Sequence, residues 1–166
     1  GGMVEKSIAR AMDSLMRRDL EASNQVIAED DFIDRKRFEI EEQCIDLIAT
    51  QQPMAGDLRI LVSMLHISVE LERMGDYAEG IARINLLLGD EQLLKPLIDI
   101  PEMAEKAAAM LHRSINAMVN RDTITAMQVC NDDDEIDALY DQVYRDLLLI
   151  MIQDPDTIQR ATFLLW

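Results

Sequence analysis

Residues 60–81 read ILVSMLHISVELERMGDYAEGI. Apolar side chains recur along this stretch at alternating spacings of four and three residues: Ile60, Met64, Ile67, Leu71, Met74, Ala78 and Ile81. Such spacing places the side chains along one side of an α-helix and is typical of a coiled-coil-like core seam. The stretch therefore predicts a long helix that packs against other helices.

The same stretch carries two carboxylates four residues apart, Glu72 and Asp76, with Gly75 between them. A spacing of four stacks both on one helix face, where their like charges repel unless something positive lies between them. They lie roughly 130° and 170° from the centre of the apolar seam, so we expect them on the outer surface. Glycine costs a helix about 1 kcal/mol relative to alanine. Its missing side chain is therefore expected to leave room for an ion or for a neighbouring helix.

Similar periodic stretches continue through the rest of the chain. They predict helices at residues 3–17, 19–50, 54–88, 101–120, 122–153 and from 155 to the end. Asp19 and Asp122 each follow an arginine and are predicted to cap the helices that they precede. Hydrophobic residues make up 49% of the 166 residues and aromatic residues only 4%, a mixture that favours helix packing over sheet packing. We therefore expect an all-α fold.

The chain is strongly acidic, with a formal net charge of -16. This charge argues against nucleic-acid binding and against electrostatic docking on anionic lipid, and it favours cations or a basic protein surface as partners. No apolar run of about 18 residues occurs, so no membrane span is expected. Cys44 and Cys130 show neither paired nor metal-type spacing, and we interpret them as reduced thiols of a cytosolic protein.

The sequence also repeats itself after a shift of 103 positions. Eight of the 17 residues from 18 to 34 are identical to their counterparts, without a gap: Arg18-Asp19 to Arg121-Asp122, Gln25-Val26 to Gln128-Val129, Asp30-Asp31 to Asp133-Asp134 and Ile33-Asp34 to Ile136-Asp137. This match indicates a tandem duplication of a three-helix unit. It predicts two bundles, at residues 1–88 and 98–166, with a linker at 89–100. The counterparts of the third helix's carboxylates would lie past Trp166, so the second bundle is expected to lack its third helix in this chain.

Asp30 and Asp34 have the same four-residue spacing as Glu72 and Asp76. If the second and third predicted helices form an antiparallel hairpin, the two pairs lie within about two residues, roughly 3 Å, of the same level. Four carboxylates then meet on two adjacent helices. The sequence therefore predicts a shallow metal site on the surface of the bundle.

All-oxygen ligands suit hard cations such as Mg²⁺, Mn²⁺, Ca²⁺ or iron, and a combined charge of about -4 is enough to hold more than one ion. In the repeat, Asp133 and Asp137 are the predicted ligands of a second site, whose other ligands would lie past Trp166. The alternative is a solvated acidic face on a very acidic protein. The level match and the repeat weigh against that alternative.

Two other kinds of function stay open: a carboxylate-bridged metal enzyme and a metal-free helical interaction module. The Glu-x-x-His pattern of di-iron bundle enzymes is absent, because serine and alanine stand three positions before His66 and His112. Neither a Gly-rich phosphate loop nor a nucleophile with its base is visible. The sequence therefore favours binding over catalysis.

Three segments resemble the PhoU family of bacterial phosphate-signalling regulators. Residues 72–78, Glu-Arg-Met-Gly-Asp-Tyr-Ala, followed by Ile81-Ala82, look like the family signature. Residues 51–59, Gln-Gln-Pro-Met-Ala-Gly-Asp-Leu-Arg, resemble the segment that precedes it, and Asp30 to Asp34 is similar to the family's other E/D-x-x-x-D motif. The resemblance covers nearly the whole chain, including the duplication.

The resemblance implies two three-helix bundles in tandem, with multinuclear iron, zinc or similar clusters held on their surfaces by these carboxylate motifs. It implies a cytoplasmic, non-enzymatic regulator that negatively controls phosphate transport and the phosphate-starvation response. Its partners would be the ATPase subunit of the phosphate ABC transporter and the phosphate sensor kinase at the inner face of the membrane, and many relatives form homodimers. The chain departs from the family at Gly80, where asparagine is common, and family members carry further residues at both ends, including a sixth helix.

Overall fold

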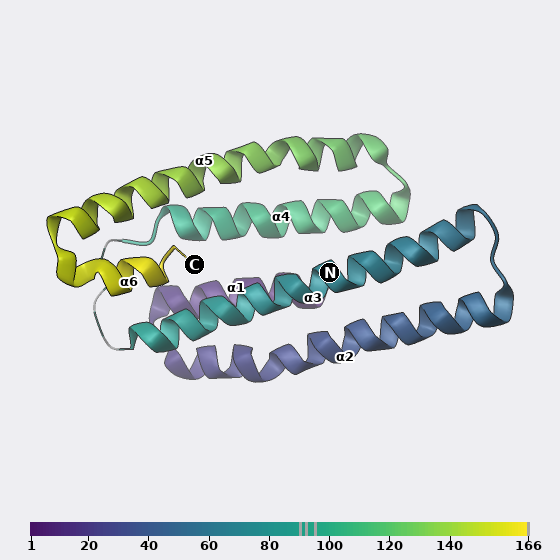
Figure 1. Cartoon of the computed structure of the whole chain (residues 1–166), viewed down its shortest axis with the longest axis horizontal. Coiled ribbons are helices and arrows are strands. Elements are labelled where there is room, and N and C mark those ends of the chain that lie inside the picture. The colour runs from purple at the N-terminus through teal and green to yellow at the C-terminus, as the bar shows by residue number, and fades with distance from the viewer. Residues whose placement is uncertain (90, 92, 95, 166) are drawn as a thin grey trace.

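The computed structural model describes residues 1–89, 91, 93–94 and 96–165, and within these residues all regular structure is helical (Figure 1). The elements are α1 (Gly2–Arg17), α2 (Leu20–Gln51), α3 (Gly56–Leu88), α4 (Asp99–Asn120), α5 (Thr123–Gln153), a 3-10 turn η1 (Pro155–Thr157) and α6 (Ile158–Phe163). The predicted all-α fold is confirmed.

Three predicted helices differ from the observed ones by more than one residue, and of these the fourth begins at Asp99 instead of residue 101. The third helix begins at Gly56 instead of residue 54, because Gln52 and Ala55 both adopt positive φ angles, 48° and 45°, which no α-helix accommodates. The last predicted helix divides into the 3-10 turn at Pro155 and the short α6. Positions 90, 92 and 95 of the predicted linker lie outside the described residues, and so does Trp166.

The two halves of the chain turn between helices in the same way. Asp19 caps α2 by accepting a hydrogen bond from the Ala22 backbone N–H, and Asp122 caps α5 by accepting from two backbone N–H groups. The arginine before each cap, Arg18 or Arg121, is left-handed, with φ angles of 58° and 55°. The predicted caps are confirmed, and the shared backbone geometry supports the internal duplication.

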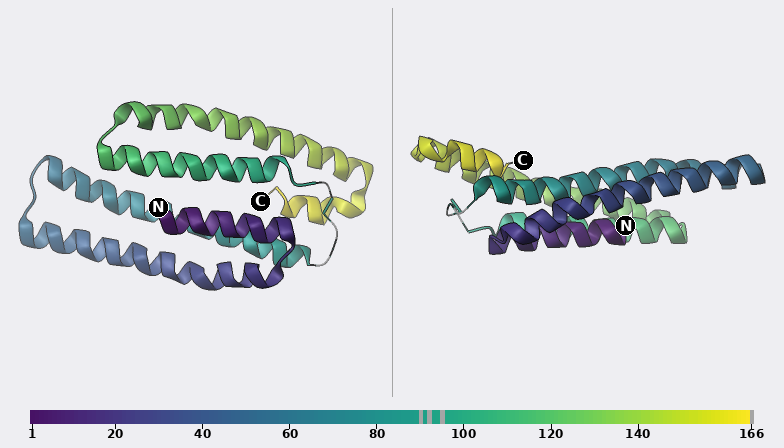
Figure 2. Two further views of the ribbon diagram at one scale, coloured as in Figure 1. Left: turned by 180° about the vertical axis from the view of Figure 1, so that it is seen from behind. Right: turned by 90° about the horizontal axis from the view of Figure 1, so that it is seen from below.

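Helices α1, α2 and α3 pack together as one bundle, and the α4–α5 hairpin lies beside it through contacts between α4 and α1 (Figure 1). The α2–α3 hairpin projects well past the N-terminal end of α1 (Figure 2). A core of apolar side chains joins the three helices and reaches α4: Val4, Ile8, Ala11, Val26, Ile33, Ala78, Ala82 and Leu111. Of the described helices, none combines the length and apolarity that a membrane span needs.

An apolar cavity of about 340 Å³ lies between the first bundle and the α4–α5 hairpin. Its lining includes Met74 and Ile81 of α3, Tyr140 of α5, and Phe163 at the end of α6. The six-residue α6 contacts both α5 and α3 and is the only described element in the position of a third helix for the second unit.

A buried polar network fastens the end of α3 to the turn between α1 and α2. Asn85 is fully buried, and its amide nitrogen donates to the Ser14 carbonyl oxygen and to the Ser23 hydroxyl, both at 2.9 Å. Its amide oxygen accepts from the Arg18 guanidinium at 2.8 Å. These bonds fix the position of α3 along the axis of α2, and so they determine which residues of the two helices lie opposite each other.

Replacing Asn85 with alanine is expected to lower the free energy of unfolding by about 2 to 3 kcal/mol, because it leaves buried partners without their hydrogen bonds. Urea denaturation followed by circular dichroism measures this change. Asn24→Ala is the matched control, because Asn24 is exposed and, among the described residues, donates only to the Leu20 carbonyl of its own helix. Equal losses in the two variants would contradict a structural role for the network.

Candidate metal centre

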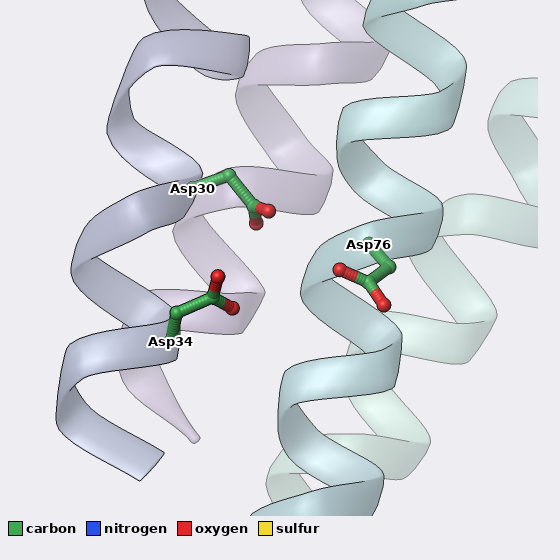
Figure 3. A group of neighbouring side chains, drawn as sticks. All are labelled: Asp30, Asp34 and Asp76. Carbon is green, nitrogen blue, oxygen red and sulfur yellow. The ribbon is translucent and has the colours of Figure 1, made fainter. Parts of the chain in front are cut away.

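Three carboxylates from two helices face one another between α2 and α3. Asp30 and Asp34 extend from α2 and Asp76 from α3, and Figure 3 shows all three directed into the same gap. One oxygen from each lies within 4.8 Å of the others. The antiparallel hairpin thus brings together three of the four carboxylates that the sequence predicts at this level.

Gly75 allows the two helices to approach closely enough for this meeting. A Cβ atom at position 75 would lie 3.1 Å from Asp30 Oδ1 and 3.1 Å from the Ile33 side chain. Distances this short are tighter than ordinary van der Waals contact. Of the two expectations for the glycine, room for a neighbouring helix is therefore the one that the structure shows.

Asp30 lies on the floor of the site, with 9% of its surface exposed. Its Oδ1 atom is buried and accepts no hydrogen bond from any described group. Burial raises the pKa of Asp30 to about 6, and the negative charges of Glu79, Asp34, Asp76 and Asp31 add to that effect. A buried carboxylate oxygen without a donor is unfavourable, and a bound cation would remove the deficit.

The spacing of the three carboxylates fits a single divalent cation. Ligand oxygens lie about 2.4 Å from Ca²⁺, so two of them on opposite sides are about 4.8 Å apart. One oxygen from each of Asp30, Asp34 and Asp76 lies within that separation of the other two. The residues present therefore fit a hard cation by charge, by donor type and by spacing.

The other predicted ligands lie outside this group of three. Glu72 is half-buried one turn before Asp76 on α3, and its role as a ligand stays a prediction. Asp133 and Asp137 are both exposed on α5, and among the described residues they form no group of three possible ligands. The second site thus also stays a prediction.

Sequence analysis missed Glu79, whose charge adds more to the raised pKa of Asp30 than any other carboxylate does. Glu79 is half-buried on α3, and Arg83 donates a hydrogen bond to its Oε1 at 2.5 Å. A signal was present, because Glu72, Asp76 and Glu79 follow spacings of four and three residues and so share one helix face. The acidic face of α3 is therefore longer by one turn than predicted.

A comparison with protein families matches the chain twice to the family described as the PhoU domain, at residues 1–84 and 100–165. The two matches correspond to the two halves of the internal duplication.

Two relatives are called phosphate-specific transport system accessory protein PhoU homolog. The protein from Aquifex aeolicus is 40% identical over 162 residues, which cover 98% of this chain and 73% of that protein. The protein from Clostridium acetobutylicum is 37% identical over 163 residues, 98% of this chain and 74% of its own length.

Two solved structures share the fold. The crystal structure of PhoU from Pseudomonas aeruginosa matches with a TM-score of 0.94 and 29% identity, over 100% of this chain and 80% of that one. The phosphate transport system regulatory protein PhoU from Streptococcus pneumoniae matches with a TM-score of 0.90 and 27% identity, over 99% of this chain and 77% of that one.

Proposed function

The chain belongs to the PhoU family, and on that basis we propose that it is a metal-binding, non-enzymatic regulator of phosphate transport and phosphate-starvation signalling. The observation that carries the proposal is the match to accessory proteins of phosphate-specific transport over 98% of the chain. We propose that its regulation is negative, and that it acts by binding the ATPase subunit of the phosphate ABC transporter and the phosphate sensor kinase.

The metal-binding part of the proposal rests on the carboxylates of α2 and α3. Asp30, Asp34 and Asp76 would hold the cation, and Asp30 Oδ1 is the buried oxygen that needs one. A bound cation supplies positive charge that neutralises the group and ties α2 to α3. The family resemblance favours iron or zinc as the metal, whereas the oxygen ligands also suit Mg²⁺, Mn²⁺ or Ca²⁺. Glu72 would add a ligand for a multinuclear site. Asp133 and Asp137 would begin the second site.

The charge of the chain supports a basic docking surface on the partners. At a net charge of -16, long-range attraction speeds association with basic protein surfaces, and long-range repulsion opposes association with nucleic acid.

We propose that the protein works in the cytoplasm as a homodimer and reaches the inner membrane through its partners, with residues 1–88 and 98–166 as its two structural units. Sedimentation velocity at two concentrations tests the dimer.

Capture of the two partners should depend on phosphate. We expect the tagged full chain to retain the transporter's ATPase subunit and the sensor kinase from lysates of its own bacterium, in different amounts at high and low phosphate. Immunoblots of the eluates measure both. If neither partner is captured at high or at low phosphate, the regulatory role is rejected. Turnover of phosphate esters or peroxide by the pure protein would favour an enzyme instead.

A further inference from the structure

The Glu79–Arg83 ion pair lies on the same face of α3 as the metal site. Asp76, Glu79 and Arg83 are spaced by three and four residues, which places their side chains within about 60° around the helix axis. Only 20% of the Glu79 side chain is exposed, against 59% for Arg83. Glu79 is therefore largely shielded from solvent, whereas its partner Arg83 is largely exposed.

This pair is in electrostatic contact with the floor of the site. Burial is the largest cause of the raised pKa of Asp30, and Glu79 adds more to it than any other carboxylate does. The hydrogen bond and the charge of Glu79 raise the pKa of Arg83, and the charge of Asp30 adds a smaller increase. Arginine stays protonated at every pH that a cell experiences. Arg83 is thus a permanent positive charge on the face of α3 that also carries Asp76.

The two residues oppose each other in their effect on a cation. Glu79 offers a further carboxylate within one helical turn of Asp76, whereas Arg83 both occupies that carboxylate and repels an incoming cation. An ion pair between partly exposed side chains is weak enough for a divalent cation to break. Cation binding would therefore release Glu79 from Arg83.

We propose that Glu79 is a further ligand of the metal centre and that Arg83 is its built-in competitor, a side chain that holds Glu79 and lowers the affinity of the site for cations. The proposal rests on the proposed metal-binding function. It makes the affinity of the site a property of this pair as well as of Asp30, Asp34 and Asp76, so that the centre releases its cation more easily than it would if Glu79 were not paired with Arg83.

Titration of the metal-free full chain with Mn²⁺, with free Mn²⁺ counted by electron paramagnetic resonance, tests the proposal. Arg83→Gln is expected to tighten binding about tenfold, because it removes one positive charge near the ion. Glu79→Gln is expected to weaken binding by a similar factor. The gain in Arg83→Gln should shrink between about 0.05 M and about 0.5 M salt, because Arg83 is largely exposed.

The double variant Glu79→Gln/Arg83→Gln separates ligation from charge, because its net charge equals that of the wild type. Binding weaker than wild type is expected if Glu79 contacts the ion, and binding equal to wild type would overturn that role. The controls are Asp13→Asn and Arg17→Gln, which change an exposed ion pair on α1 with an N–O distance of 3.2 Å. These controls should leave Mn²⁺ binding unchanged.

Two failures are distinguishable. If the wild type binds Mn²⁺ no better than Asp30→Asn does, the metal-binding function itself is wrong, and the role of the pair fails with it. If the wild type binds but Arg83→Gln behaves like Arg17→Gln, only the competitor role is overturned. A further readout needs no metal: in the metal-free protein, Arg83→Gln should lower the melting temperature more than Arg17→Gln does, because it removes a positive charge near the carboxylates of the site.

Discussion

Asp30→Asn is expected to lower the cation affinity of the protein by about 100-fold or more while making the metal-free protein more stable. The affinity falls because the number of charged ligands sets how tightly an oxygen site holds a cation. The stability rises because a buried carboxylate among other negative charges becomes neutral. The new amide nitrogen can also donate to the carboxylates of Asp34 and Asp76, which face it.

The size of the gain follows from the environment of Asp30. Its pKa of about 6, against an ordinary 3.8, means that the folded state disfavours the charged form at neutral pH. We expect the free energy of unfolding to rise by about 1 to 2 kcal/mol at pH 7, after allowance for solvent screening. Urea denaturation with chelator present measures stability, and elemental analysis plus Mn²⁺ titration measures binding.

Asp31→Asn is the matched control, because it removes the same charge from the neighbouring, exposed residue. It should keep cation binding and change stability little, since Asp31 adds least to the shifted pKa of Asp30. If Asp30→Asn is less stable than the wild type with chelator present, the buried charge is compensated in a way that the structure does not show. If it still binds the cation, Asp30 is not a ligand.

The level of the site along the helices could be predicted from the sequence, because an antiparallel helical hairpin relates residues by their distance from the turn. Asp30 and Asp34 meet Asp76 as that geometry requires. The error of two residues in the start of α3 does not matter, because it shifts the level by only about 3 Å. The helix caps could also be predicted from the sequence, because a capping residue such as Asp19 binds backbone N–H groups of the helix that follows it.

The depth of the site could not be predicted, because depth depends on how one helix is rotated against another. The periodic pattern placed Glu72 and Asp76 on the outer surface, whereas the site also has a buried floor at Asp30. That burial comes from the packing of Ile33 and Asp30 over Gly75, a contact between residues far apart in the sequence. Periodicity within one helix carries no information about such contacts.

The close packing over Gly75 leads to the second large effect, that of a side chain placed there. Gly75→Val is expected to lower the free energy of unfolding by about 3 kcal/mol and to abolish cation binding. Its Cβ would lie 3.1 Å from both Asp30 Oδ1 and the Ile33 side chain, and the two added methyl groups must displace α2 from α3. Displacement of α2 carries Asp30 and Asp34 away from Asp76, so the site opens at the same time as the core.

Gly80→Val, five residues further along α3, is the control that isolates this contact. Apart from its chain neighbours and the nearby backbone of α3, no atom of the described residues lies within 4 Å of a Cβ built at Gly80, so the variant makes the same chemical change in open space. Because valine is a slightly better helix former than glycine, Gly80→Val should be neutral or stabilising by a few tenths of a kcal/mol. Urea denaturation and Mn²⁺ titration compare the two variants. Since helix propensity acts equally at both positions, the difference between them measures the cost of separating α2 from α3, and equal stability would show that the site does not need their close approach.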